Sequence, residues 1–347
     1  MSNFTSDNVS PVCDSIMAAI SAANSDHVPS YGGDPLTQRL TQSMREVFET
    51  DLAVFPVATG TAANALALSQ LSPPYGAIYC YDAAHIVTDE CGAPEFFTGG
   101  AKLIGLPAAD GRISAAQIAS AIGFANEMGV HHVKPGAISI TQATEWGTVY
   151  ENAQISDIAE LARSNQLQVH MDGARFANAL VHLDCTPAQA TWKSGVDVLS
   201  FGATKNGAMC AEAVIFFNPQ AVQDFDRRRK RAGHLWSKLR FVSAQLLAYL
   251  DNELWLANAR NANHMAGRLA KGLQQISCVR LLHAVQANEV FVAMPEQLVA
   301  ALEQAGFQFY RWPLYALPTE VAIRLVTSYA TQGTEIDAFL AAARRLA

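Results

Sequence analysis

The chain has 347 residues, of which 50% are hydrophobic and 16% are charged. That length is natural for two domains, and the composition fits a folded, enzyme-like protein rather than a disordered one. The net charge of −7, from 24 basic and 31 acidic residues, argues against a nucleic-acid partner, whose binding would need a basic surface.

The sequence also shows no sign of a membrane protein. The first residues, MSNFTSDNVSP, have neither the charged region nor the apolar run of a secretory signal. Residues 52–81 carry no charge, but Pro, Gly, Thr and Asn interrupt them, so they do not predict a membrane-spanning helix. The six cysteines are scattered without a C-x-x-C pair, which favours free thiols in a reducing compartment. We therefore expect a cytoplasmic protein.

From residue 34 onward the predicted elements alternate between helices and strands. Asp34 and Pro35 are typical of a helix start, and apolar residues recur at helical spacing up to Phe48. Strands are then predicted at 53–57, 77–81, 101–107, 136–142, 167–172, 196–202 and 213–218, and helices at 61–71, 114–127 and 155–166. Because these strands are apolar on both faces, they indicate an α/β fold with a mostly parallel sheet between helices.

The pattern changes after residue 233. A long helix is predicted over 234–250, followed by strands at 288–295, 307–312 and 321–328, a helix at 296–306 and a last helix. This is a smaller α+β pattern. We expect an N-terminal segment over 1–25, a large domain over 26–250 and a small C-terminal domain over 251–347.

Three strand ends carry the residues that suggest chemistry, because ligands of open α/β sheets bind at the carboxyl ends of strands. Gly60 and Thr61 begin a helix whose free amides suit an anion such as phosphate, although they also read as an ordinary helix cap. Asp172 ends a strand and either binds a ligand or caps the next helix. Lys205 lies among small uncharged residues in SFGATKNGAMCAEA and is either solvated or held for its amine.

Together these residues fit one cofactor, pyridoxal 5′-phosphate. That cofactor needs a lysine to form an imine, an acid to hold its ring nitrogen protonated and a site for its phosphate. The residues alone therefore predict a protein that binds pyridoxal phosphate.

A resemblance to a known family makes the prediction more specific. Short motifs in the family's order run along nearly the whole chain: FTSDNVS, YGGDP, TGTAAN, DAAH, HMDGARF, SFGATKNG and VAIRLVTS. In them the chain resembles the L-threonine aldolase family, also called the β-eliminating lyase group, of fold-type-I pyridoxal-phosphate enzymes. The resemblance implies the fold-type-I architecture of a mostly parallel sheet between helices with a smaller α+β domain.

The resemblance also implies roles for single residues. Lys205 carries the cofactor, Asp172 holds its ring nitrogen, and His85 stacks on its ring and takes part in proton transfer. The remaining positions are the phosphate ligands Gly60, Thr61 and Thr204, the substrate-carboxylate ligands Ser6, Arg175 and Arg324, and Tyr31 near the site, with Arg175 also beside the cofactor. Arg324 has support of its own, because it alone is polar on the strand VAIRLV and a buried guanidinium needs an anion. That anion is either the substrate or an Asp or Glu side chain.

One position departs from the family pattern. In TQATEWGTVY, many family members have a histidine where this chain has Glu145, a candidate for engaging the β-hydroxyl group of the substrate. Glu145 can accept the same proton, but its charge differs. The neighbouring Trp146 either lines a pocket for an aromatic side chain or packs in the core.

The run of five cations at 227–231 reads as a solvated face or a subunit contact. In the family a cation from this region of a neighbouring subunit reaches the cofactor phosphate, so Lys230 and Arg231 are candidates and a homodimer or homotetramer is expected. His131 and His132 have no third ligand at metal-binding spacing, so we expect no catalytic metal.

The resemblance implies cleavage of a β-hydroxy-α-amino acid, such as threonine, allo-threonine or phenylserine, to glycine and an aldehyde. Two alternatives stay open: β-elimination or transamination on the same fold, and cofactor binding without turnover.

Overall fold

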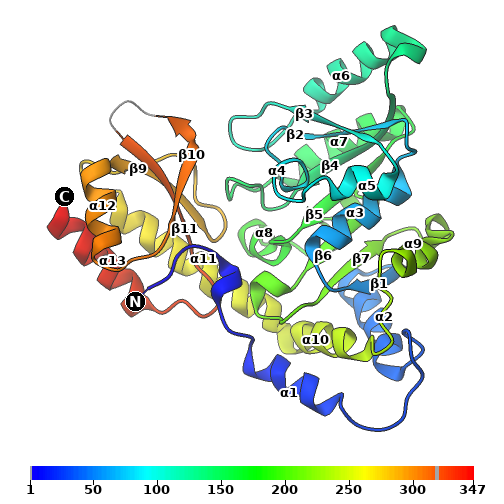
Figure 1. Ribbon diagram of the computed structural model, residues 1–347, viewed down its shortest axis with the longest axis horizontal. Helices are drawn as coiled ribbons and strands as arrows, with labels where there is room; N and C mark the ends of the chain where they lie inside the picture. The colour runs from blue at the N-terminus through cyan, green and yellow to red at the C-terminus, as the bar shows by residue number, and fades with distance from the viewer. Residues whose placement is uncertain (1, 317–319) are drawn as a thin grey trace.

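Two β-sheets organise the part of the chain that the structure describes (Figure 1). The computed structural model describes residues 2–316 and 320–347, and it describes side chains outside 313–319. Across the larger sheet the strand order is β1 (Ala53–Val57), β7 (Glu212–Phe216), β6 (Val198–Gly202), β5 (Gln168–Gly173), β4 (Lys134–Thr141), β2 (Gly76–Tyr81) and β3 (Lys102–Leu106).

The larger sheet is mostly parallel, which confirms the prediction. Strands β3, β2, β4, β5 and β6 pair in parallel, whereas β7 is antiparallel to both of its neighbours, β6 and β1. Since β1 and β6 both oppose β7, they run in the same direction. The carboxyl ends of β1, β5 and β6 therefore meet at one edge of the sheet.

Helices flank the larger sheet, and the predicted ones occur within a few residues of their expected bounds. They are α1 (Asp14–Ala22), α2 (Pro35–Phe48), α3 (Gly60–Leu71), α4 (His85–Thr88), α5 (Ala93–Thr98), α6 (Ala115–Met128), α7 (Asn152–Ser164), α8 (Phe176–Leu183), α9 (Phe225–Arg231) and α10 (Arg240–Leu250). Helix α3 packs against β1, β4, β5, β6 and β7. Short 3-10 turns are η1 (Asp7–Val9), η2 (Gly129–His131), η3 (Trp192–Ser194), η4 (Thr204–Asn206), η5 (Pro219–Val222) and η6 (Asp251–Glu253).

The prediction of one helix over 234–250 was wrong at its start, because α10 begins only at Arg240. Residues 234–239 make hydrogen bonds to distant backbone instead. The Ala58 amide donates to Nδ1 of His234 over 3.3 Å, and the Tyr31 amide donates to the Ser237 carbonyl over 3.1 Å.

The second sheet is antiparallel and forms the smaller part of the molecule with three helices. Its order is β10 (Tyr310–Ala316), β11 (Glu320–Val326), β9 (Glu289–Pro295) and β8 (Arg280–Leu281), and its helices are α11 (Leu254–Leu273), α12 (Glu296–Gln304) and α13 (Gly333–Leu346). Each part has its own hydrophobic core. Helix α11, which the sequence did not predict, contacts α8 in the larger part and β9 in the smaller one (Figure 1).

The N-terminal segment crosses between the two parts. Phe4 lies in the smaller core at 1% exposure, and its amide donates to the Gln308 carbonyl over 2.8 Å. The Val326 amide donates back to the Phe4 carbonyl, also over 2.8 Å, so the segment extends the smaller sheet. The domain boundaries at 25 and 250 stay a prediction.

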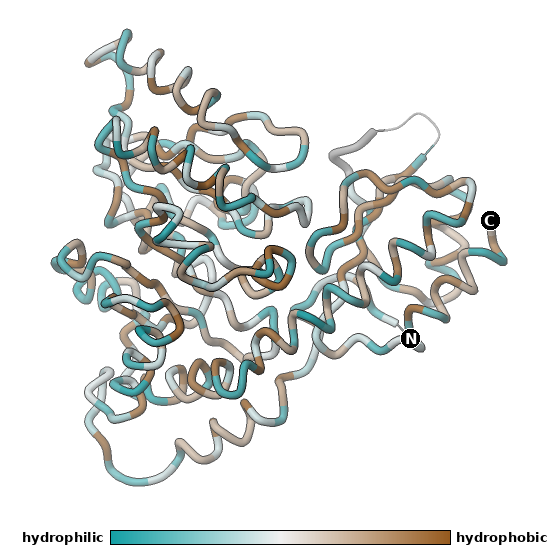
Figure 2. The backbone as a smooth tube through the Cα atoms, turned by 180° about the vertical axis from the view of Figure 1, so that it is seen from behind, coloured by the Kyte–Doolittle hydropathy of each residue, from teal (hydrophilic) through white to brown (hydrophobic). Residues whose placement is uncertain are grey.

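The hydropathy of the helices matches these surroundings. Hydrophobic and hydrophilic residues alternate along the long helix α11, as expected for a helix with one buried face (Figure 2). Among the described residues, no helix is both long and apolar enough to cross a membrane.

Candidate active site

The amino end of α3 offers an open anion site at the shared edge of the sheet. Thr59, not Gly60, is the helix cap, and its hydroxyl accepts the Ala62 amide over 3.2 Å. The amides of Gly60 and Thr61 donate to no other described group. A Cβ built on Gly60 would meet nothing within 4 Å. The helix dipole and two free amides therefore face unfilled space that suits a phosphate.

Asp172, at the end of β5, is held on two sides. It is 4% exposed, its Oδ2 accepts the Asn64 side-chain amide over 2.7 Å, and its Oδ1 accepts the Ala174 amide over 2.9 Å. Helix α8 follows, but its cap is Arg175 and no side chain caps it. Asp172 is therefore not the cap of α8 in this structure.

Asn64 connects Asp172 to a second buried carboxylate. It also donates to Oε1 of Glu90 over 2.8 Å, and the same oxygen lies 2.8 Å from Nδ1 of His85. The hydrogen bond to Glu90 raises the pKa of His85. The ligand atoms of His85, Glu90 and Asp172 all lie within 4.8 Å of one another, and these hydrogen bonds account for the cluster.

Sequence reasoning missed Asn64 and Glu90. Asn64 is 2% exposed, and the signal for it was its place in the motif TGTAAN. Glu90 lies between α4 and α5, five residues after His85, and no pattern in the sequence pointed to it.

Lys205 lies in the one-turn helix η4, directly after β6. The next residue, Asn206, anchors this turn by donating to the Tyr249 hydroxyl over 2.7 Å and to the Trp255 carbonyl over 2.8 Å. Gly207 follows at φ +113°, where a Cβ would lie 2.5 Å from Sγ of Cys13. The turn that presents the lysine is therefore fixed by its buried neighbours.

Thr204, the residue before the lysine, is engaged by the strand beside it. Its amide donates to Oε1 of Glu212 over 3.2 Å, and its hydroxyl accepts the Ala211 amide over 3.2 Å. Burial raises the pKa of Glu212 to about 7. A second buried acid thus stands next to the lysine turn.

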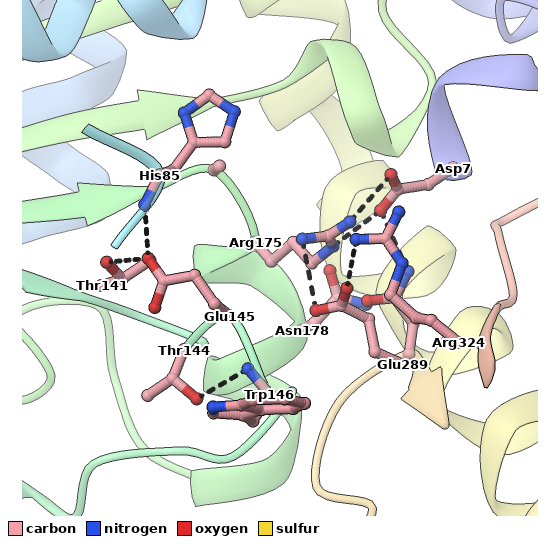
Figure 3. A network of polar contacts seen from close by, with 12 residues as sticks. Asp7, His85, Thr141, Thr144, Glu145, Trp146, Arg175, Asn178, Glu289 and Arg324 are labelled. Carbon is pink, nitrogen blue, oxygen red and sulfur yellow. Dashed lines mark hydrogen bonds and ion pairs between the residues drawn. The ribbon is translucent and has the colours of Figure 1, made fainter. Parts of the chain in front are cut away.

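Two arginines that the sequence singled out meet at the junction of the two parts (Figure 3). Arg175 binds Asp7 through two nitrogens, over 2.8 and 3.1 Å, and its third nitrogen lies 3.2 Å from Glu289. Nη1 of Arg324 lies 3.6 Å from the same glutamate, and its Nη2 donates to the Thr5 carbonyl over 3.2 Å. The anion that Arg324 was expected to need is thus a side chain of the protein in this structure.

Glu145 lies across the site from this arginine pair, and its carboxylate points away from the pair, toward Thr141 and the backbone of His85 (Figure 3). Its Oε1 accepts the His85 amide over 3.0 Å and the Thr141 hydroxyl over 2.8 Å. Its Oε2 is buried and makes no hydrogen bond within the described residues. Burial raises the pKa of Glu145 to about 7, so this carboxyl can either hold or accept a proton near neutrality.

Trp146 packs in an aromatic cluster with His283, Phe291 and Trp312. It is 5% exposed, and its indole nitrogen donates to the Tyr81 hydroxyl over 2.8 Å. These contacts are those of a packing residue.

The structure does not bring every expected residue into the cluster. Ser6 caps η1, where its hydroxyl accepts the Asn8 amide over 3.2 Å, and it reaches Arg175 only indirectly, by donating to Oδ1 of Asp7 over 3.4 Å. Lys230 lies 4.4 Å over the ring of Tyr31. In the described part of the chain, neither Tyr31, Lys230 nor Arg231 forms a hydrogen bond or ion pair with Lys205, His85 or Asp172. The cation run is also not fully solvated, since Arg229 is buried against the Pro56 carbonyl.

Comparisons with known proteins agree on one group. Residues 3–297 match the β-eliminating lyase family. The chain is 45% identical to the low specificity L-threonine aldolase of Pseudomonas sp. strain NCIMB 10558 and 43% identical to that of Pseudomonas aeruginosa, over 88% of both chains in each case. Among solved structures, a threonine aldolase from Leishmania major superposes with a TM-score of 0.93 at 28% identity, over 100% of this chain and 99% of that one.

Proposed function

The chain belongs to the β-eliminating lyase family, and from this we propose that it binds pyridoxal 5′-phosphate and cleaves β-hydroxy-α-amino acids such as L-threonine to glycine and an aldehyde. The observation that carries the proposal is the meeting of an open helix end, a buried carboxylate and an anchored lysine at one edge of the larger sheet. The threonine aldolases at 45% and 43% identity support the choice of reaction.

The residues present fit the cofactor. Gly60 leaves unfilled space in front of two free amides, which suits a phosphate. Asp172 is a buried acid that can bind a protonated ring nitrogen, and Lys205 supplies the amine. When bound, pyridoxal phosphate supplies a carbonyl carbon that amines can join and a ring that draws electrons from the neighbouring carbon.

The side chains of this protein then bind and orient the amino acid. Arg175 and Arg324 both lie beside Glu289 at the junction of the two parts, and we assign the substrate carboxylate to them. A carboxylate held by two guanidinium groups cannot rotate freely, so the position of the bond to be broken is fixed.

Proton transfer falls to the opposite side of the site. Oε2 of Glu145 has no hydrogen-bond partner among the described residues, and a pKa near 7 lets it accept the β-hydroxyl proton at neutral pH. Nδ1 of His85 is bonded to Glu90, so its orientation is set and its other nitrogen stays available for a ligand.

We extend the proposal to the assembly. Lys230 and Arg231 are exposed and lie in α9, so they are available to the site of a neighbouring subunit in a homodimer or homotetramer.

A product analysis tests the proposed reaction. Purified protein is incubated with L-threonine and with L-phenylserine, and glycine, aldehyde, 2-oxo acids and ammonia are measured together. Equal amounts of glycine and aldehyde are expected. 2-Oxobutyrate from L-threonine or phenylpyruvate from L-phenylserine, each with ammonia and without glycine, would replace the proposal by β-elimination. A β-hydroxy-2-oxo acid without free ammonia would replace it by transamination.

A further inference from the structure

Glu289, the first residue of β9, is a buried carboxylate between the two arginines assigned to the substrate (Figure 3). Its side chain is 1% exposed. One of its oxygens lies 3.2 Å from Nη1 of Arg175 and the other lies 3.6 Å from Nη1 of Arg324. A single glutamate thus bridges both guanidinium groups.

The bridge is electrostatic and poorly hydrogen-bonded. Neither oxygen of Glu289 has a hydrogen-bond partner among the described residues, and Nε of Arg324 is likewise buried without one. Arg175, by contrast, donates from two of its nitrogens to Asp7 in a close bidentate pair. Asp7 is therefore the hydrogen-bonded partner of Arg175. Glu289 lies only beside the nitrogens of the two arginines that Asp7 does not occupy.

The backbone keeps Glu289 in this place. It pairs with Val326 in the smaller sheet. On the other side, a Cβ on Gly147 would come within 3.0 Å of the Cβ of Glu289, so the loop that carries Glu145 packs directly against it. The backbone of Glu289 is therefore held in place, and only its side chain can move when a ligand binds.

The charges of this cluster cancel. Arg175 and Arg324 bring two positive charges, and Asp7 and Glu289 bring two negative ones. A substrate carboxylate would add a third negative charge to a buried group that is already neutral, which costs free energy unless another attachment compensates. An amino acid has such an attachment through its amino group, which a simple carboxylate lacks.

We propose that Glu289 is an internal competitor of the substrate carboxylate, and that it sets the specificity of the site by keeping carboxylates without an α-amino group off Arg175 and Arg324. This inference rests on the proposed function, because it takes these arginines as the carboxylate site. Glu289 is a specificity-determining residue in this account and takes no part in proton transfer.

The test uses Glu289→Gln, which keeps the shape of the side chain and removes its charge. The thermal midpoint of the cofactor-loaded protein is measured with increasing acetate in a zwitterionic buffer free of other small anions, and acetamide serves as the uncharged probe. Acetate should raise the midpoint of the variant but not that of the wild type, because a ligand that binds the native state stabilises it. Acetamide should raise neither.

Competition against L-threonine gives a second readout. The inhibition constant of acetate should fall by about tenfold or more in Glu289→Gln, and the KM for L-threonine should fall while kcat changes little, as expected for a change in uniform binding. Glu320→Gln is the matched control. It removes the same charge from an ion pair with Arg280 in the same sheet, at 2.9 Å, and should respond to acetate as the wild type does.

Equal acetate responses in the wild type and Glu289→Gln would overturn the proposal. If Glu289→Gln does not fold, Glu289→Asp replaces it: its shorter side chain withdraws the charge from both arginines, so an acetate response above that of the wild type is expected, and none would overturn the proposal equally. The midpoint assay does not depend on turnover. A wild type that makes no glycine refutes the proposed reaction, and the acetate result still decides the role of Glu289.

Discussion

The polar side chains of the site are held in place by other polar side chains rather than by solvent. Asn64 bonds both Asp172 and Glu90, and Glu90 bonds His85. Such buried networks fix orientation, and each member depends on the next because an unpaired buried polar group is costly. Replacing single members therefore tests distinct roles.

Asp172→Asn should bind the cofactor but turn over more slowly. The neutral amide keeps the size of the side chain but stabilises positive charge on the ring nitrogen poorly. We expect kcat to fall by more than about a hundredfold, equivalent to roughly 2.7 kcal/mol, with a smaller change in KM. Asp197→Asn is the control: it alters a half-buried aspartate just before β6, which accepts the Val169 amide of β5 over 2.8 Å. Near-normal turnover of loaded Asp172→Asn would exclude this role.

The pKa of Glu145 predicts an acidic limb in the pH profile. Burial raises that pKa to about 7, so the carboxyl is protonated below pH 7 and cannot accept a proton there. We therefore expect kcat to rise as the pH passes upward through about 7 and Glu145 ionises. Glu145→Gln should lower kcat and remove this limb.

A matched variant separates Glu145 from the other acid with a pKa of about 7. Glu212→Gln changes a carboxyl whose pKa burial also raises to about 7, but which accepts the Thr204 amide rather than the His85 amide. It should keep the acidic limb. If the acidic limb is lost in Glu212→Gln and kept in Glu145→Gln, the group that titrates is Glu212, and our assignment to Glu145 is wrong.

Helix ends and turns decide where the site residues lie. Helix α3 brings an uncovered amino end to the sheet edge, and η4 closes with Gly207 in the left-handed region, where its lack of a Cβ lets Cys13 approach. The backbone at Gly207 requires glycine, whereas Gly60 leaves the end of α3 open.

Gly60→Ala should weaken cofactor binding without weakening the fold. A methyl group there enters the open space at the end of α3 and meets no protein atom within 4 Å, so the helix tolerates it. We expect a several-fold higher dissociation constant for the cofactor, followed by absorbance titration. Gly123→Ala in α6, which also meets nothing within 4 Å, should leave that constant unchanged. Equal constants for all three proteins would show that the phosphate binds elsewhere.

Sequence patterns predicted the larger sheet well because its strands are apolar on both faces and its helices have regular apolar spacing. Helix α11 was not predicted because its buried face contains asparagines, whose polar side chains interrupt the apolar pattern. Asn258 is buried and donates to the Asn206 carbonyl over 2.8 Å, and Asn263 bonds Asn178 over 2.9 Å. Glu289 left no local pattern to detect, because the arginines that it meets lie far away in the chain. Asp172 and Lys205, by contrast, follow predicted strands and could be found.

The candidate site takes residues from both parts of the molecule. We propose that a neighbouring subunit adds further residues to it. Arg175 comes from the larger part and Arg324 from the smaller one, while Lys230 and Arg231 lie exposed in α9. Sedimentation of the active protein should show a dimer or tetramer. Lys230→Ala and Arg231→Ala should weaken cofactor binding, and mixing either with a Lys205→Ala subunit should restore part of the activity. A fully active monomer would contradict a site that is shared between subunits.

The N-terminal segment has a consequence for the order in which the site is made. The Thr5 carbonyl accepts a hydrogen bond from Arg324, 319 positions later, and Asp7 binds Arg175. During synthesis the first residues leave the ribosome long before their partners exist, so the cluster closes only when the last strand of the smaller sheet has emerged. Premature termination anywhere before that strand yields a protein without the arginine pair.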